Sequence, residues 1–301
     1  MRQNKYTLPG LLFCLALTGV LRSESETSKT DQTPRILRDL RDSSSLKVLI
    51  AAHRGGYESD KVDETPENSL ANIQNSERKR YELYETDIQR TRDGHFVIMH
   101  DPTIDRETSG VGKVSEMTLD ELRGLGKRYR DGTLSQERVA TLEEFLIHGK
   151  GHTLFKADMK PGVSKHFGEI MELVAKHDAI SEIIFRVPYR EADLLDQYRT
   201  SGGPFAKHTL MFMVTSQKQV ADIRDRFDSA TIEIKLDKSD PANEKKLELI
   251  RYAHNKRFIV ETHAEGSNDD WSKLIDAGVR IFHARAPSKV RKFLDTLPVS
   301  E

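Results

Sequence analysis

The sequence has 301 residues, of which 37% are hydrophobic and 32% are charged, and its formal net charge is −1. This composition is typical of a globular protein that buries a full core, as one large α/β domain or two small ones. The balanced charge gives no support to a general nucleic-acid binder or to binding on anionic membranes, so we expect no nucleic-acid partner.

Residues 1–22 predict a signal peptide or a short membrane anchor. Arg2 and Lys5 precede an apolar run from Leu8 to Leu21, which is too short for a comfortable membrane span. We therefore expect export to the periplasm or the exterior, with the segment either cleaved or kept as an anchor. Membrane contact is expected only through this segment. Its cleavage would remove Cys14, the only cysteine, and with it disulfides and thiol catalysis.

Residues 23–45 are rich in Ser, Thr, Glu, Asp and Arg and predict a linker, with a short helix around Ile36 to Leu40. Residues 46–301 alternate short apolar runs with amphipathic segments, which predicts one domain with a parallel sheet. The expected strands are Val48–Ala52, Leu83–Ile88, Phe96–Met99, Thr153–Met159, Ile183–Val187, Thr209–Val214, Thr231–Leu236, Phe258–Thr262 and Arg280–His283. The expected helices are Glu67–Tyr81, Thr141–Gly149, Ser164–His177, Glu191–Tyr198, Gln217–Phe227, Asn243–Asn255, Asp269–Ala277 and Ser288–Leu297.

The order of these elements predicts a (β/α)₈ TIM barrel. Eight strand–helix units remain when Phe96–Met99 is treated as a hairpin partner, and a barrel of this kind takes about 250 residues. The rival is an open doubly wound sheet. It would usually have a glycine-rich phosphate loop after its first strand, and His53-Arg54-Gly55-Gly56 is not such a loop.

Residues 102–140 interrupt the alternation with turn-rich sequence and a short helix near Leu119 to Leu122. They predict a small insertion after the second strand, at the carboxyl face of the barrel. Such an insertion either walls one side of a pocket or is an excursion without function.

Polar side chains gather at the ends of the first strands. Glu85 and Asp87, at i and i+2 on one strand, point to the same face and can hold one hard cation such as Ca²⁺ or Mg²⁺. His53 and His100 each follow a short apolar run, so both imidazoles are expected at carboxyl ends of strands. Imidazole exchanges protons near neutral pH, and the set predicts metal-assisted acid–base catalysis.

Seven motifs in order resemble the glycerophosphodiester phosphodiesterase family, strongly over residues 48–125 and at the level of the fold after Lys160. They are His53-Arg54-Gly55, Pro66-Glu67-Asn68-Ser69, Glu85-x-Asp87, Thr91-x-Asp93-Gly94, Val97-x-x-His100-Asp101-Pro102, Gly110-x-Gly112-x-Val114 and Thr118-Leu119-x-Glu121-Leu122. The resemblance implies a TIM barrel of the PLC-like phosphodiesterase type. It also implies hydrolysis of glycerophosphodiesters to sn-glycerol 3-phosphate and an alcohol.

The resemblance also implies roles for individual residues. His53 and His100 would be the acid–base pair, and Arg54 would contact the phosphate. The divalent ion would bind Glu85 and Asp87. The family's third ligand is a glutamate in Glu-x-Lys, where this chain has Asp158-Met159-Lys160. Aspartate is one methylene shorter, so the ion would shift or a water would intervene. Lys160 would help to neutralise the phosphate.

The chemistry agrees with these roles. Attack on a phosphodiester places charge on the equatorial oxygens, which a divalent ion, Arg54 and Lys160 would stabilise. One histidine would deprotonate the nucleophile, and the other would protonate the departing alkoxide. The nucleophile is either water or the glycerol 2-hydroxyl. Glu67 is expected either at the site or in the first turn of a helix that begins at Pro66.

The second half of the chain departs from the family pattern. It places Arg186, Lys235, Glu261, His263 and Arg285 near strand ends, where the family has aromatic and small residues. Either Arg186 and Arg285 reach the substrate, which would then be more anionic than glycerophosphocholine, or these charges pair among themselves. Two other functions stay open: a phospholipase-like or other phosphodiester hydrolase on the same barrel, and a non-catalytic protein that binds an anionic ligand.

Overall fold

The structure is a computed structural model that describes residues 32–41, 47–56, 65–204, 206, 208–227, 229–235, 240 and 242–297. Within these residues, eight parallel strands close into a barrel in the order β1-β11-β10-β9-β8-β7-β6-β2, and β2 pairs back to β1. The barrel strands are β1 Leu49–Ala52, β2 Leu83–Arg90, β6 Leu154–Met159, β7 Ile183–Pro188, β8 Leu210–Val214, β9 Thr231–Ile234, β10 Ile259–His263 and β11 Val279–Ala284. The predicted TIM barrel is confirmed.

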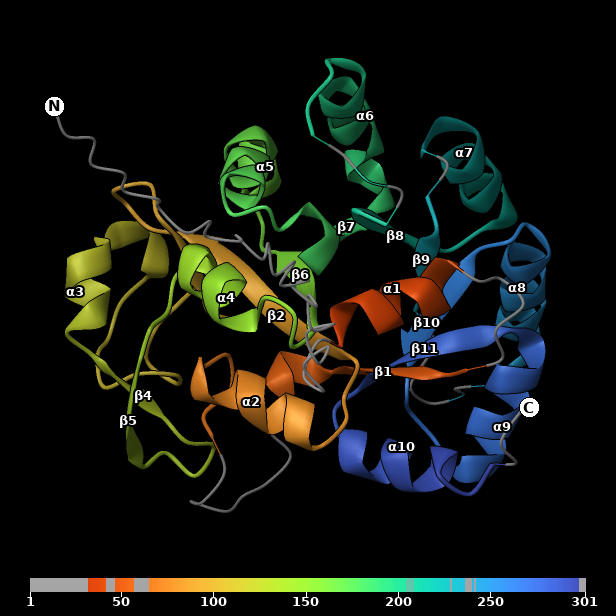
Figure 1. Ribbon diagram of the computed structural model, residues 1–301, viewed down its shortest axis with the longest axis horizontal. Coiled ribbons are helices and arrows are strands. Elements are labelled where there is room, and N and C mark those ends of the chain that lie inside the picture. The colour runs from red at the N-terminus through yellow and green to blue at the C-terminus, as the bar shows by residue number, and fades with distance from the viewer. Residues whose placement is uncertain are drawn as a thin grey trace, which may run out of the picture.

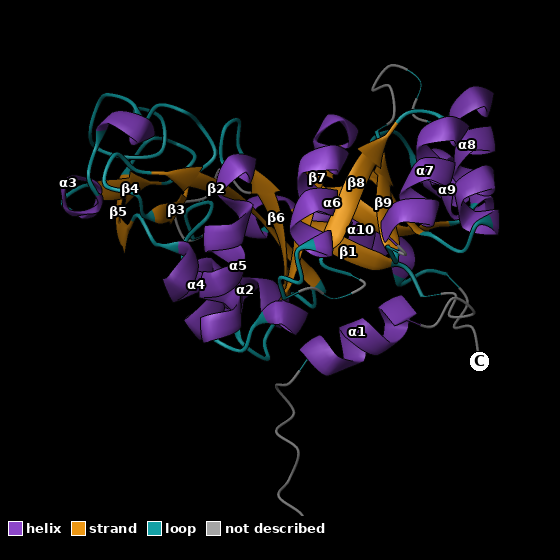
Figure 2. Ribbon diagram, turned by 90° about the horizontal axis from the view of Figure 1, so that it is seen from above, coloured by secondary structure: helices purple, strands orange, loops and turns teal. Residues whose placement is uncertain are grey.

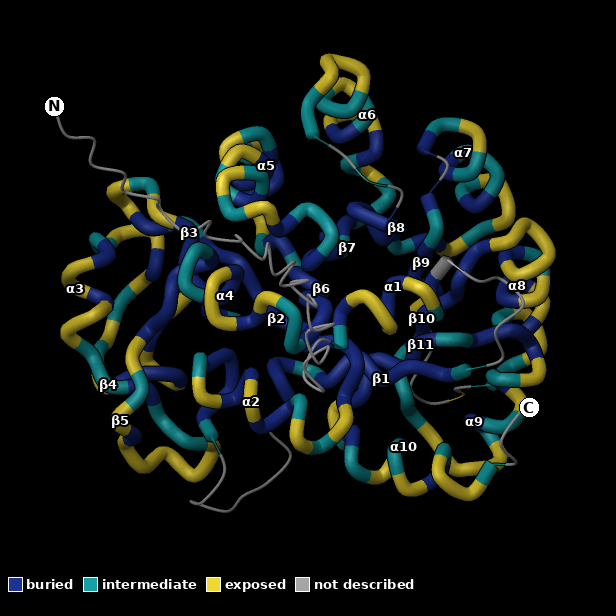
Figure 3. Tube along the Cα trace, viewed as in Figure 1, coloured by how far each residue is buried: buried dark blue, intermediate teal, exposed yellow. Residues whose placement is uncertain are grey.

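Helices surround the barrel on the outside (Figure 1). They are α2 Ala71–Arg78, α4 Leu142–Gly149, α5 Phe167–Lys176, α6 Ala192–Thr200, α7 Gln217–Phe227, α8 Glu244–Asn255, α9 Asn268–Ala277 and α10 Pro287–Leu294. Each buries one side and exposes the other (Figure 3). The buried side is mostly apolar, except in α2, where Asn72, Asn75 and Ser76 are buried beside Ile73. Short 3₁₀ segments are η1 His53–Gly55, η2 Val114–Glu116, η3 Ser164–His166, η4 Ile180–Glu182 and η5 Tyr189–Glu191.

Helix α1, Thr33–Arg41, closes the amino-terminal end of the barrel (Figure 2). Its apolar residues Ile36, Leu37 and Leu40 are buried. They form one cluster with the first inward-facing residues of the strands, which are Leu49, Ala51, Leu83, Leu154, Ile184, Met211, Ile259 and Ile281. The short helix expected around Ile36 to Leu40 is α1. Residues 1–22 lie outside the described residues, and no helix among those described is long and apolar enough to cross a membrane.

The insertion lies to one side of the barrel and begins after β3, Phe96–Ile98, which pairs antiparallel with β2 (Figure 1). It contains α3, Leu119–Arg123, and a hairpin of β4, Gly126–Arg128, and β5, Leu134–Arg138. It has a small core of its own, in which Ile104, Val114 and Leu122 are buried. The sequence predicts α3 but not the hairpin.

A layer of charged side chains fills the middle of the barrel, above the apolar layer that α1 covers. Side chains alternate between the two faces of a strand, so the inward residue after Leu154 is Lys156 and the one after Ile259 is Glu261. Lys156 donates to Glu261 although β6 and β10 are not neighbours in the sheet, so the bond crosses the interior. Barrels of this kind usually fill this level with branched apolar residues.

Candidate active site

The loop after β1 holds Arg54 in a strained conformation. Arg54 has φ 51° and ψ 38°, in the left-handed region that residues with a Cβ rarely adopt. Its N–H donates to Glu85 Oε2 at 2.8 Å, and its carbonyl accepts from Asn68 N and Asn72 Nδ2, both at 3.2 Å. Gly55 follows, where a Cβ would lie 2.4 Å from the side chains of Asn72 and Tyr84. These contacts fix the loop that carries His53.

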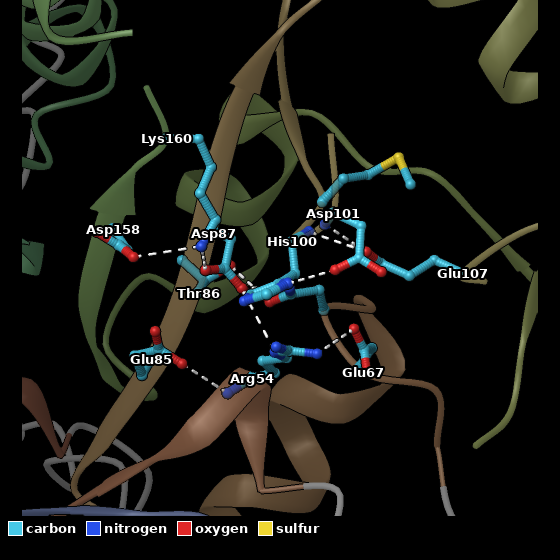
Figure 4. Close-up of polar contacts among 12 residues, drawn as sticks. Arg54, Glu67, Glu85, Thr86, Asp87, His100, Asp101, Glu107, Asp158 and Lys160 are labelled. Atoms are coloured by element: carbon cyan, nitrogen blue, oxygen red, sulfur yellow. Dashed lines mark hydrogen bonds and ion pairs between the residues drawn. The ribbon is translucent and has the colours of Figure 1, made fainter. Parts of the chain in front are cut away.

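The Arg54 side chain reaches the acids of β2 and of the loop after β1. Its Nη1 donates to Glu67 Oε1 at 2.9 Å, and its Nε lies 3.8 Å from Asp87 Oδ2 (Figure 4). Glu67 also accepts two hydrogen bonds from Arg106, of 2.8 and 2.9 Å. Helix α2 begins only at Ala71. The alternative that placed Glu67 in the first turn of a helix is therefore wrong, because buried pairing with two arginines keeps this segment out of the helix.

Glu85 and Asp87, which are buried, and Asp158, which is half-buried, form an acidic cluster. Each offers a carboxylate oxygen, and these atoms lie within 4.8 Å of one another. Burial and the neighbouring Asp87 raise the pKa of Glu85 well above its usual value. Burial alone would also raise the pKa of Asp87, but the Lys160 ammonium and His100 lower it. Converging buried oxygens are the ligands that Ca²⁺ and Mg²⁺ prefer, so the residues present fit a divalent ion.

Two cations already contact this cluster. Lys160 Nζ lies 2.6 Å from Asp87 Oδ1 and 3.3 Å from Asp158 Oδ2 (Figure 4). Arg186 Nη1 lies 3.2 Å from the same Asp158 oxygen, and its guanidinium donates to Glu233 at 2.9 Å. Asp158 therefore lies with the other two acids, as expected. Arg186 is held by acids, which agrees with the alternative that the charges of the second half pair among themselves.

His53 lies at the carboxyl end of β1, with its ring centroid 5.3 Å from that of His283. Burial, reinforced by the Arg54 guanidinium, lowers the pKa of His53 to about 3. The ring is therefore neutral at neutral pH, and one of its nitrogens carries no proton. Arg285 is exposed, and its charge also lowers the pKa of His53.

His100 follows β3 and faces the same end of the barrel. Its Nδ1 lies 2.6 Å from Asp101 Oδ1, so the carboxylate orients the ring. The N–H groups of His100 and Asp101 both donate to Glu107 Oε1, at 3.0 and 2.9 Å. Glu107 and its neighbour Lys127 are completely buried, with Lys127 Nζ 3.6 Å from Glu107 Oε2. The insertion thus holds the backbone that carries His100.

Below the acidic cluster, the charges of the middle layer pair with one another. Lys156 Nζ lies 3.0 Å from His283 Nδ1, and His263 stacks on His283 with ring centroids 4.4 Å apart. His263 Nε2 lies 3.3 Å from Glu233 Oε1. Lys235, by contrast, is exposed. Of the residues expected near strand ends, Glu261 and His263 are thus taken up by internal pairs.

Several residues of the site are not predicted from the sequence. Asn68 donates to Asp87 Oδ2 at 2.9 Å and accepts from Thr86 at 2.9 Å, and it stands in the motif Pro66-Glu67-Asn68-Ser69. Lys156 shares the inward face of β6 with Asp158, two positions later, and Glu233 stands two positions before Lys235 at the end of β9. This alternation was the signal that could have found them. No sequence pattern indicates the role of Glu107, because its partners His100, Asp101 and Lys127 come together only when the insertion folds.

A (β/α)₈ barrel with two histidines, an arginine and an acidic cluster at the carboxyl ends of its strands defines a barrel protein with a hydrolase-type site. Residues 53–193 match the model of the Glycerophosphoryl diester phosphodiesterase family. These residues therefore form a domain of the glycerophosphodiester phosphodiesterase family.

Individual relatives agree with this assignment. A glycerophosphodiester phosphodiesterase of Caldanaerobacter subterraneus is 35% identical over 120 residues, which are 39% of this chain and 47% of that protein. The glycerophosphodiester phosphodiesterase of Bacillus subtilis is 27% identical over 159 residues, 46% of this chain and 52% of that protein. The chain thus spans about half the length of these curated relatives.

Solved structures share the fold over most of the chain. A glycerophosphoryl diester phosphodiesterase of Parabacteroides distasonis has a TM-score of 0.72 at 20% identity, covering 89% of this chain and 94% of that one. An Oleispira antarctica phosphodiesterase, solved in complex with the product sn-glycerol-3-phosphate, has a TM-score of 0.65 at 19% identity and covers 84% of this chain and 99% of that one. At these identities, the likeness extends to the fold.

Proposed function

We propose that the chain is a metal-dependent phosphodiesterase that hydrolyses glycerophosphodiesters to sn-glycerol 3-phosphate and an alcohol. The observation that carries this proposal is the meeting of His53, His100 and Arg54 with the cluster of Glu85, Asp87 and Asp158. The family assignment of residues 53–193 supports it. The Oleispira structure with its bound product supports the substrate class.

The proposed roles follow from the contacts. His53, at the carboxyl end of β1 and beside Glu85, would accept the proton of the nucleophile. His100, oriented by Asp101, is suited to return a proton to the departing alkoxide. Arg54 and Lys160 would bind the phosphate oxygens, and Glu67 would orient Arg54 through their 2.9 Å hydrogen bond.

Glu85, Asp87 and Asp158 would hold a divalent ion, Ca²⁺ or Mg²⁺. When bound, the ion would act as a Lewis acid on a phosphoryl oxygen. Lys160 and Arg186 contact Asp158 from two sides and would fix its carboxylate toward the cluster. Arg186, held by Glu233 as well, orients this ligand and does not serve as a substrate contact in our proposal.

The proposal is tested on the purified full chain with glycerophosphocholine and glycerophosphoglycerol, with Ca²⁺ or Mg²⁺ and with EDTA. We expect release of sn-glycerol 3-phosphate with metal and none with EDTA. His100→Ala should lower kcat by about a hundredfold to ten-thousandfold. His95→Ala is the matched control, because His95 is an exposed histidine on the same hairpin.

Two results would point to the other functions. Turnover of vesicle lipid without turnover of either soluble diester would indicate a phospholipase-like enzyme. Binding of metal and phosphate with no turnover of any diester would indicate a binding protein. Loss of metal binding in Asp158→Ala, measured by calorimetry, would show independently of activity that the cluster holds the ion.

We also propose that the chain is exported through residues 1–22. The support is the charged start and apolar run of this segment. Since α1 covers the end of the barrel from Thr33 onward, cleavage is expected before Thr33. Fractionation of cells and sequencing of the mature amino terminus test this. A start beyond Arg41 would contradict it.

A further inference from the structure

A cavity of ≈ 420 Å³ lies beside the proposed phosphate site, on the side of the insertion. Its lining residues are Arg54, Glu67, Arg106, Arg128, Tyr129, Arg130, Asp131 and Gly132. Arg54 lines this cavity and also lies beside the acidic cluster, because its Nε is 3.8 Å from Asp87 Oδ2. A molecule bound at the cluster would therefore meet the cavity directly through Arg54.

The lining has an excess of positive charge. It contains four guanidinium groups and two carboxylates. Both carboxylates already have partners, because Glu67 accepts from Arg54 and Arg106, and Asp131 accepts from the N–H and hydroxyl of Thr133 at 2.9 and 2.7 Å. Among the described residues, Glu67 is thus held by two arginines, and the hydrogen bonds of Asp131 come from Thr133 and not from Arg128.

Arg128 is the residue on which the inference depends. Its Nε donates to the Thr108 carbonyl at 2.7 Å and its Nη1 to the Gly132 carbonyl at 2.7 Å. Carbonyl groups hold a guanidinium in place without cancelling its charge. Within the part of the chain that the structure describes, Arg128 has no carboxylate partner, and its Nη2 remains for a ligand. A planar guanidinium fixed in this way is suited to bind phosphate.

We propose that this cavity binds a second phosphate carried by the alcohol part of the diester. The inference rests on the proposed function, which assigns the glycerol phosphate to the cluster and leaves the alcohol for the neighbouring space. The preferred substrate is then a glycerophosphodiester whose alcohol is itself phosphorylated. Hydrolysis breaks the bond between phosphorus and the alcohol oxygen, water supplies the hydroxyl to phosphorus, and a proton goes to the alcohol.

The test compares glycerophosphoinositol with glycerophosphoinositol phosphate on the full chain with metal present. We expect kcat/KM to be at least about tenfold higher for the phosphorylated diester, and the preference to shrink as salt rises. Arg128→Gln should reduce the ratio of the two kcat/KM values by about tenfold. Arg138→Gln is the matched control, since Arg138 lies on the same hairpin, bonds only to carbonyls and does not line the cavity.

A second readout does not need turnover. Inositol monophosphate, titrated calorimetrically into the same proteins, should bind the wild type and Arg138→Gln and bind at least about tenfold more weakly to Arg128→Gln. Equal kcat/KM values for the two diesters would overturn the inference and leave the proposed function standing. If neither diester is cleaved, the proposed function fails, and the titration alone decides whether the cavity binds phosphate.

Discussion

Lys156 and His283 meet at the centre of the barrel, with Nζ of the lysine 3.0 Å from Nδ1 of the histidine, and both side chains are almost fully buried. Lys156 also pairs with Glu261 and lies 3.9 Å from Glu233. Burial and the Lys156 ammonium lower the pKa of His283 well below its usual value. His283 is therefore neutral, and the Lys156 ammonium is the positive charge that lies beside both Glu261 and Glu233.

Replacing this lysine should destabilise the protein strongly. Lys156→Met leaves Glu261 and Glu233 buried without the ammonium, which costs about 3–5 kcal/mol in the free energy of unfolding. Urea unfolding measures the loss. The double variant Lys156→Met/Glu261→Leu should be more stable than Lys156→Met alone, because it also removes a buried charge. Equal stability of the single variant and the wild type would contradict the pairing.

The stability of the protein should depend on pH through Glu261. Burial raises the pKa of Glu261 to about 7, against the effect of Lys156, whereas a glutamic acid in the unfolded chain titrates at about 4.3. Between these values the folded state binds the extra proton, so the free energy of unfolding falls as pH rises. Urea unfolding at about pH 5 and about pH 7.5 measures this fall. Glu261→Gln should make it smaller, and an unchanged slope would contradict the assignment.

Glu107 should act as a positioning residue for His100. The Glu107 carboxylate accepts hydrogen bonds from the N–H groups of His100 and Asp101 and lies beside Lys127. Glu107→Gln removes its negative charge. A small displacement of His100 lowers kcat by up to about a hundredfold and leaves KM nearly unchanged. Steady-state kinetics below the unfolding temperature test this, with Glu116→Gln as the control because Glu116 is exposed in the same insertion. A loss of stability with normal kcat would indicate a merely structural role.

Helix α1 should be required for the stability of the barrel. Ile36 is completely buried in the cluster at the amino-terminal end, and Ile36→Ala should cost about 2–5 kcal/mol. Arg38→Ala changes an exposed residue of the same helix and should cost much less. Thermal unfolding of both variants measures these losses. Equal losses of stability in the two variants would show that the cluster around Ile36 contributes little to the stability of the barrel.

Much of the fold could be predicted from the sequence, because apolar runs of strand length alternate with amphipathic segments. Helix α7, Gln217–Phe227, coincides with its prediction. The hairpin of β4 and β5 could not be predicted, since Gly126-Lys127-Arg128 has no apolar alternation, and Lys127 is buried only through its partner Glu107.

The acids and histidines of the site could be predicted because they stand close together in the chain and follow apolar runs. The layer of charged side chains in the middle of the barrel could not be predicted. Lys156 and Glu261 are 105 positions apart, and their pairing appears only when the barrel closes. The partners of Arg186 could not be predicted either. Its position near a strand end allowed either a substrate contact or an ion pair. Its bonds to Glu233 and Asp158 depend on three different strands.

The insertion combines two tasks in one stretch of chain. Glu107 holds His100, and the turn between β4 and β5 lines the arginine-rich cavity. An engineer who exchanged this stretch for that of another barrel would therefore replace the support of His100, the proposed acid, together with one wall of the proposed second phosphate site. Changes of substrate preference in this chain are best made at the tip of the hairpin, with Glu107 and Lys127 left in place.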